Sequence, residues 1–320
     1  MKGLASLMRA GVGSVAVLLA VSACGGVAQT TTSSASAGTG PSTTLSPTTT
    51  STLVSSSSTS RTTSTSAPSQ FTKTSGIEYA PPHELDVYAP QEPGPWPVII
   101  VVHGYGGSRN TLIHLSSTLA AQGAVVFNLE VAMVEPFLPA IEQVSCAVRF
   151  ARATAATYGG DTSRIILVGG SGGAAASAVV GLAGDDFEGN CLVVEGSSLP
   201  DAIVGHEGPY DWAIRAYDPQ RFDPTVLAID NPDLLDAINP YSYIGGNPDL
   251  KVRLIHGIDN DDTIFEVLPE VSTQFHEILI DAGYDAELTI IEGGTHFDHT
   301  NPYSETFKVI VQQVMNVASD

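Results

Sequence analysis

Apolar runs and amphipathic segments alternate along the chain from residue 97 onward. Residues 97–103 (PVIIVVH) form a continuous apolar run, which is typical of a strand buried on both faces. Residues 139–157 repeat apolar positions at helical spacing, and the residues after 171 form an alanine-rich helix that ends near 184. The same pattern predicts strands at 124–129, 164–168, 202–206, 252–256 and 287–291, and helices at 112–122, 269–282 and 304–317. This alternation predicts an α/β domain with a mostly parallel central sheet and helices on both faces.

The first 23 residues have the layout of a secretory signal, with a basic start, an apolar stretch over 12–21 and then small residues. The apolar stretch is shorter than the ~20 residues that a membrane-spanning helix needs. It ends in VSAC, which resembles the bacterial lipobox and implies a lipid on Cys24. An ordinary signal peptide or a short membrane anchor is the alternative. We therefore expect an exported protein, lipid-anchored to the outer face of the cytoplasmic membrane.

Residues 24–70 predict a tether. From Val27 to Gln70 the chain is mostly Ser and Thr, contains no aromatic residue and carries one charge, Arg61. Such a segment cannot bury enough apolar surface to offset its ordering entropy, and as a flexible chain it would span about 35–40 Å. Residues 71–320 are then the catalytic domain.

The charge balance of the sequence disfavours two classes of binding partner. The formal net charge is −21, from 34 acidic and 13 basic residues, which disfavours binding to nucleic acid or to anionic lipid. Membrane attachment would therefore depend on the lipid at Cys24.

Cys146 and Cys191 are an even pair in the exported domain, which predicts a disulfide, with two separate buried thiols as the alternative.

A serine surrounded by glycines stands where a predicted strand meets a predicted helix. Residues 169–173 (GGSGG) satisfy G-x-S-x-G, and this context predicts a nucleophile elbow with Ser171 at its tip. The helix that follows directs its N-terminal dipole at the place where negative charge develops. A phosphate-binding loop is the alternative, but the lysine of a P-loop is missing.

A serine nucleophile needs a base and a carboxylate that orients it, in the chain order serine, acid, histidine. His296 lies in a small-residue loop just after the last predicted strand, with His299 as the near alternative. These two histidines with Asp298 could bind a metal, but no further ligand is suggested, so we expect none. For the acid we favour Asp261 in the loop after the strand at 252–256, followed by Asp262 and Asp259.

The loop after residues 97–103 reads HGYGG and can bring backbone N–H groups close to the acyl carbon. With the amide of Gly172 it would form an oxyanion hole. We interpret His103 as a residue that fixes this loop rather than as a base.

From about residue 77 to 317 the chain resembles an α/β-hydrolase, specifically the bacterial esterases of the hormone-sensitive-lipase branch. The likeness rests on ELDVYAP, PVIIVVHGYGG, AVRFARATAATYGGDTSRIILVGGSGG, AIVGHEGPYD, NPYSYIGGNPDLKVRLIHG and GGTHFDH, in that order. It implies Ser171 as nucleophile, His296 as base, and the amides of Tyr105, Gly106 and Gly172 as oxyanion donors. In the family's HGGG motif this chain has Tyr105 at the third position. It also has Asn260 where the family's acid stands, so an insertion would shift the acid to Asp261 or Asp262.

Together these features predict a serine esterase that hydrolyses carboxylic esters through an acyl-enzyme, without a cofactor. A small acyl ester, an esterified glycan or a lipid would be the substrate. A catalytically weak cell-surface binding protein and a serine peptidase on the same fold are the alternatives. The peptidase is disfavoured because the sequence shows no β-propeller partner domain.

Overall fold

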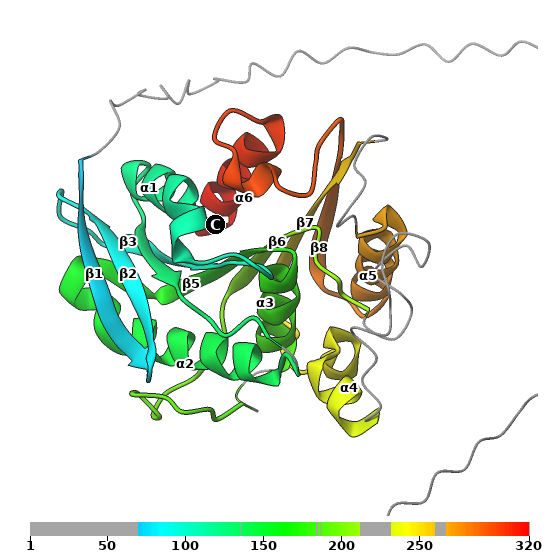
Figure 1. Cartoon of the computed structure of the whole chain (residues 1–320), viewed down its shortest axis with the longest axis horizontal. Coiled ribbons are helices and arrows are strands. Elements are labelled where there is room, and N and C mark those ends of the chain that lie inside the picture. The colour runs from blue at the N-terminus through cyan, green and yellow to red at the C-terminus, as the bar shows by residue number, and fades with distance from the viewer. Residues whose placement is uncertain are drawn as a thin grey trace, which may run out of the picture. The chain divides into compact units, whose positions relative to one another are not determined.

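The computed structural model describes residues 70–134, 136–183, 185, 187–211, 232–259 and 267–319. Within them, eight strands form one sheet in the order β1-β2-β4-β3-β5-β6-β7-β8 (Figure 1). The strands are β1 (Phe71–Ala80), β2 (His83–Pro90), β3 (Trp96–Val102), β4 (Val125–Leu129), β5 (Gly160–Gly170), β6 (Ala202–His206), β7 (Lys251–Ile258) and β8 (Asp285–Glu292). The pairs β1–β2 and β2–β4 are antiparallel and all other neighbours are parallel, which confirms the predicted mostly parallel sheet.

The central strands are apolar at every position because both faces of the sheet are covered. On β3, Val98 and Ile100 pack into one hydrophobic core, whereas Ile99 and Val101 pack into another. All four side chains are fully buried, and each stabilises the fold by roughly 1.5–3 kcal/mol relative to an exposed position.

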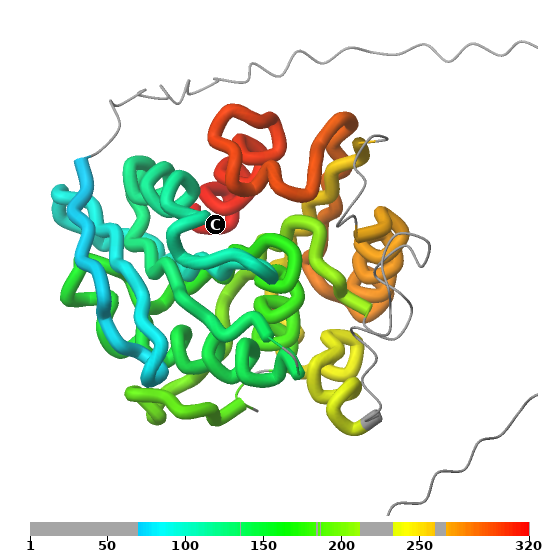
Figure 2. The backbone as a smooth tube through the Cα atoms, in the orientation of Figure 1, coloured from blue at the N-terminus to red at the C-terminus, as the bar shows by residue number. Residues whose placement is uncertain are grey.

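Helices cover the two faces separately. α1 (Ile113–Ala121) and α6 (Glu305–Ser319) share one core, and α2 (Leu138–Thr154), α3 (Gly172–Ala183), α4 (Pro232–Ile238) and α5 (Pro269–Asp281) share the other. After β8, which is the last strand of the sheet, the chain turns back and continues into α6, which lies beside α1 (Figure 2). This return brings the loop before α6 to the ends of the parallel strands.

The predicted elements match the observed ones closely, with three exceptions. The apolar pattern did not predict β1, β2 or α4. β1 is an edge strand whose residues Thr72–Ser75 are exposed, so it carries no continuous apolar run. Among the described residues, no helix is both long enough and apolar enough to cross a membrane.

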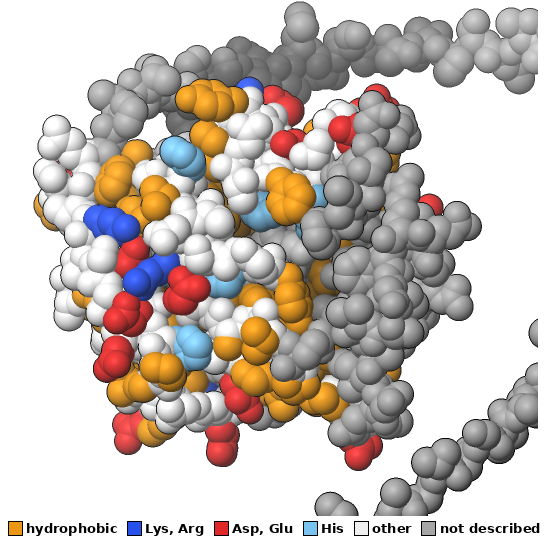
Figure 3. All heavy atoms as spheres, in the orientation of Figure 1, with side chains coloured by type: hydrophobic (Ala, Val, Ile, Leu, Met, Phe, Trp, Pro, Cys, Tyr) orange, Lys and Arg blue, Asp and Glu red, His pale blue; other side chains and the backbone are white. Residues whose placement is uncertain are grey.

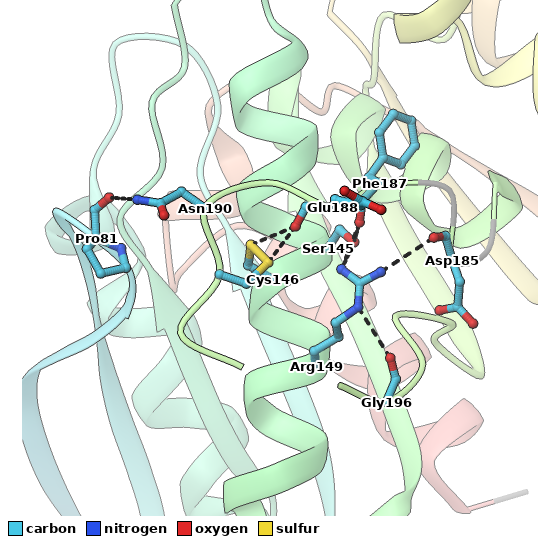
Figure 4. Close-up of a disulfide and its surroundings, with 10 residues drawn as sticks. Pro81, Ser145, Cys146, Arg149, Asp185, Phe187, Glu188, Asn190 and Gly196 are labelled. Atoms are coloured by element: carbon cyan, nitrogen blue, oxygen red, sulfur yellow. Dashed lines mark hydrogen bonds between the residues drawn. A yellow bond between two sulfur atoms is a disulfide. The ribbon is translucent and has the colours of Figure 1, made fainter. Parts of the chain in front are cut away.

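A disulfide and an arginine fasten the segment after α3 to α2 (Figure 4). The sulfur atoms of Cys146 on α2 and Cys191 are bonded in the structure. One turn further along α2, the buried guanidinium of Arg149 donates to the carbonyl oxygens of Phe187, at 2.7 Å, and of Gly196, at 3.3 Å. Both attachments hold the segment after α3 against α2.

Candidate active site

Ser171 lies at a sharp turn between β5 and α3. Its φ angle of +54° is in the left-handed region, which costs a non-glycine residue about 1–3 kcal/mol. Both backbone polar groups of Ser171 are hydrogen-bonded: its N–H donates to the carbonyl oxygen of His206 at 2.8 Å, and its carbonyl accepts the Ala174 N–H at 2.9 Å. Ser171 is half-buried.

Glycines two residues on either side of Ser171 permit this turn. A Cβ atom on Gly169 would overlap the backbone carbonyl of Gly173, and one on Gly173 would overlap the carbonyl oxygen of Val102. The predicted elbow geometry is therefore present, with the serine between a buried strand and a helix N-terminus.

His296 lies in the loop after β8 and is buried. Its Nδ1 is 2.8 Å from Oε2 of Glu207. Because an ionised carboxylate only accepts hydrogen bonds, the Nδ1 atom carries the proton, and the basic lone pair of the neutral ring is on Nε2. This is the tautomer that a general base for a serine needs.

Glu207 directly follows β6 and is completely enclosed, with 1% of its surface exposed. Its Oε1 accepts the Gly257 N–H at 2.9 Å and lies 3.3 Å from Nε2 of His206. Burial by itself would raise the pKa of Glu207, but the contacts with His206 and His296 hold it well below its usual range. The carboxylate is therefore ionised beside His296 at neutral pH.

Sequence reasoning did not select Glu207 as the acid. Asp261 and Asp262, the predicted acids, lie outside the described residues, so that prediction remains untested. Asp259, the third candidate acid, is described and directly follows β7. A signal for Glu207 was available, because a carboxylate directly after a buried parallel strand stands at the edge where such strands end.

His103 fixes the loop that follows β3, as its sequence position suggested. Its Nε2 accepts the Val131 N–H at 3.2 Å, so the proton is on Nδ1, which donates to the Gly104 carbonyl oxygen at 2.9 Å. The same carbonyl accepts the Gly107 N–H at 3.1 Å. Burial lowers the pKa of His103, which keeps the ring neutral in this role.

This loop lies against the serine turn. A Cβ atom placed on Gly104 would be 2.9 Å from Cβ of Ser171, and one placed on Gly172 would be 3.3 Å from Cδ2 of Tyr105. The structure therefore brings together the segments that carry the predicted oxyanion donors Tyr105, Gly106 and Gly172. Their role as donors remains a prediction.

Apolar side chains border the serine turn. The Cβ position of Gly172 is also 3.4 Å from Sδ of Met133 and 3.5 Å from the ring of Phe137, which stacks on Tyr105. Phe297, beside His296, is 55% exposed. Hydrophobic side chains lie beside histidines on the face in Figure 3, next to a group of acidic and basic side chains. Among the described residues, no group of three or more His, Cys, Asp or Glu could hold a metal ion.

Comparison with known proteins gives matches to esterases. The BD-FAE family model matches residues 85–279, more than half of the chain. Esterase LipC of Mycobacterium tuberculosis is 36% identical over 129 residues. That match covers 38% of this chain and 32% of LipC, so it spans about a third of the length of this curated relative.

Solved structures match the chain as well. A truncated carbohydrate esterase from gut microbiota superposes with a TM-score of 0.62 at 22% identity, covering 79% of this chain and 98% of that one. A bifunctional GH43-CE protein of Bacteroides eggerthii superposes with a TM-score of 0.61 at 26% identity, covering 77% of this chain and 35% of that one. These likenesses show the α/β-hydrolase fold.

Proposed function

The chain belongs to the BD-FAE family of hormone-sensitive-lipase-like esterases, and on that premise we propose that it hydrolyses carboxylic esters with Ser171, His296 and Glu207. The observation that carries the proposal is the 2.8 Å contact between Glu207 and Nδ1 of His296, in a fold that presents Ser171 at a strained turn. A buried carboxylate, an oriented imidazole and an elbow serine are the three parts that serine hydrolysis needs.

In the first half of the reaction, the Ser171 hydroxyl oxygen attacks the acyl carbon while Nε2 of His296 takes its proton. The ester carbonyl oxygen becomes an oxyanion, for which we propose the backbone N–H groups of Tyr105, Gly106 and Gly172 as donors. Glu207 stabilises the imidazolium. The bond from the acyl carbon to the alcohol oxygen then breaks, the alcohol leaves with the proton from His296, and the acyl group stays on Ser171.

In the second half, water attacks the acyl-enzyme. His296 takes one proton from the water as its oxygen bonds to the acyl carbon, and the bond to the Ser171 oxygen breaks. The proton returns to Ser171, and the acid leaves. No electron is transferred and no cofactor is needed in either step.

For the substrate we propose a short acyl ester carried on a carbohydrate alcohol. One of the structural relatives, the truncated gut-microbiota protein, is named a carbohydrate esterase, which supports the alcohol part. Met133 and Phe137 place apolar atoms 3.4 and 3.5 Å from the Cβ position of Gly172, next to the nucleophile, which supports an apolar acyl group.

The location of the enzyme also remains a proposal. Residues 24–69, which include Cys24, lie outside the described residues, and the lipid anchor that would hold the domain outside the cytoplasmic membrane rests on the sequence alone. Metabolic labelling with a fatty-acid analogue, compared between the wild type and Cys24→Ala, tests it.

The test of function combines covalent labelling with turnover. We expect a fluorophosphonate probe to label the wild type and the protein to hydrolyse p-nitrophenyl acetate and acetylated xylo-oligosaccharides. Ser171→Ala should abolish both, whereas Ser163→Ala, at an exposed serine on β5, should change neither. A wild type that is neither labelled nor active would favour the binding protein, and faster turnover of aminoacyl amides than of esters would favour the peptidase.

A further inference from the structure

His299 is a buried histidine that the mechanism above does not use. It belongs to the short helical turn η5 (Asp298–Thr300), and it lines a small, mostly apolar space together with Val101, Leu115 and Ile310. Burial lowers the pKa of His299 to about 3, so the ring is neutral at physiological pH. A polar ring in such a site is costly unless its hydrogen bonds are made, which indicates that the ring has a specific partner.

The partner is the backbone of the proposed base. Nδ1 of His299 is 2.9 Å from the carbonyl oxygen of His296. A carbonyl oxygen only accepts, so Nδ1 carries the proton and donates it. The main chain of His296 is thereby attached to a rigid, buried ring.

The face of the same ring lies against the residue before the proposed nucleophile. A Cβ atom on Gly170 would be 2.6 Å from Cδ2 of His299 and 2.7 Å from its Nε2. Any larger residue at position 170 would therefore displace the ring. This contact explains why the variable position of the G-x-S-x-G motif is a glycine in this chain.

A second buried histidine, His206, contacts the nucleophile, the carboxylate and the ring of His299. The His206 carbonyl accepts the Ser171 N–H at 2.8 Å, its Nε2 lies 3.3 Å from Glu207, and its ring is 5.3 Å from that of His299. The backbone of the nucleophile, the carboxylate and the base loop are thus joined through two buried imidazoles.

We propose that His299 is a positioning residue that sets the distance between Ser171 and His296; the proposal rests on the esterase function above. The ring acts as a spacer of fixed size, with the Gly170 backbone against its face and the His296 carbonyl bonded to its Nδ1. It does not touch the substrate. Displacement of a catalytic group by about 1 Å can lower a rate about 100-fold, so loss of this spacer should lower kcat.

The first test compares two variants of similar shape. His299→Leu removes the donor, whereas His299→Asn retains an N–H donor near the position of Nδ1. We expect His299→Leu to lower kcat for p-nitrophenyl acetate about 100-fold with KM within about threefold of the wild type. His299→Asn should recover at least tenfold of that loss. His276→Leu is the matched control, because it removes an imidazole on α5 that contacts the Ala286 carbonyl at 3.3 Å, and it should leave kcat unchanged.

The second test uses the contact with Gly170. Gly170→Ala should lower kcat more than tenfold in the wild type but less than threefold in a His299→Ala background, because the smaller side chain leaves room for the added methyl group. Urea unfolding of every variant shows whether the domain still folds.

The results separate the two proposals. A wild type without Ser171-dependent turnover overturns the esterase function. An active wild type whose kcat is unchanged in His299→Leu, or falls equally in His299→Leu and His299→Asn, overturns the positioning role. Additive effects of Gly170→Ala and His299→Ala overturn it as well.

Discussion

The substitution Glu207→Gln gives the sharpest test of the proposed mechanism, because it removes the charge with almost no change in shape. In the wild type, Oε2 contacts Nδ1 of His296 at 2.8 Å and Oε1 accepts the Gly257 N–H at 2.9 Å. The glutamine oxygen can keep only one of these bonds. If it keeps the bond to Gly257, its NH₂ group faces His296 and favours the tautomer with the proton on Nε2, which cannot accept a proton from Ser171.

The size of the effect follows from the burial of the pair. Opposite charges about 4 Å apart attract by about 4 kcal/mol at an effective dielectric constant of about 20. This attraction acts on the imidazolium that forms in the transition state, and it is equivalent to about 10³-fold in rate. The wrong tautomer adds to the loss, so we expect kcat to fall by about 10³–10⁴-fold.

The assay is steady-state hydrolysis of p-nitrophenyl acetate, with Asp261→Asn and Asp262→Asn measured in parallel. We expect KM of Glu207→Gln to stay within a few-fold, and both aspartate variants to keep most of their turnover. Urea unfolding must show that the Glu207→Gln domain is folded. If Glu207→Gln kept its turnover while Asp261→Asn lost several orders of magnitude, Glu207 would not be the acid and the acid would be in the loop after β7.

Three further predictions concern stability and the tether. Replacing Cys146 and Cys191, which are 45 residues apart, with serines should lower the free energy of unfolding by about 4 kcal/mol, measured by urea denaturation. Alkylation of the two thiols in the absence of a reductant would show that the disulfide does not form. Burial lowers the pKa of His256 to about 4 and that of His299 to about 3, whereas a histidine of the unfolded chain has a pKa of ~6.5. Between the folded and unfolded pKa values the unfolded state binds more protons than the folded state, so the urea midpoint should fall as the pH drops from 7 to 4. A midpoint independent of pH in this range would contradict that burial. Proteolytic removal of residues 27–70 should leave ester turnover unchanged, and a large loss would mean that this segment is more than a tether.

Local signals in the sequence were sufficient for most of the fold. The apolar run at 97–103 predicted β3 within one residue at each end, and the pattern at 269–282 predicted α5 equally well. Both elements are long and periodic, and their burial requires the apolar residues that make them recognisable. β1 lacks this signal because much of an edge strand faces solvent, so its pairing with β2 is evident only from the structure.

In the candidate site, too, some residues could be predicted from their neighbours in the sequence and others could not. Ser171 and His296 could be predicted because each stands in a small-residue loop directly after a strand, which is a feature of neighbouring residues alone. The partner of His296 could not, because several loops carry carboxylates and only the folded sheet decides which of them reaches the imidazole. Glu207 does so from the end of β6, and its hydrogen bond joins residues 89 positions apart in the chain. The contact of His299 with Gly170 belongs to the same class: the sequence determined which groups could do chemistry, and the packing of strand ends decided which of them meet.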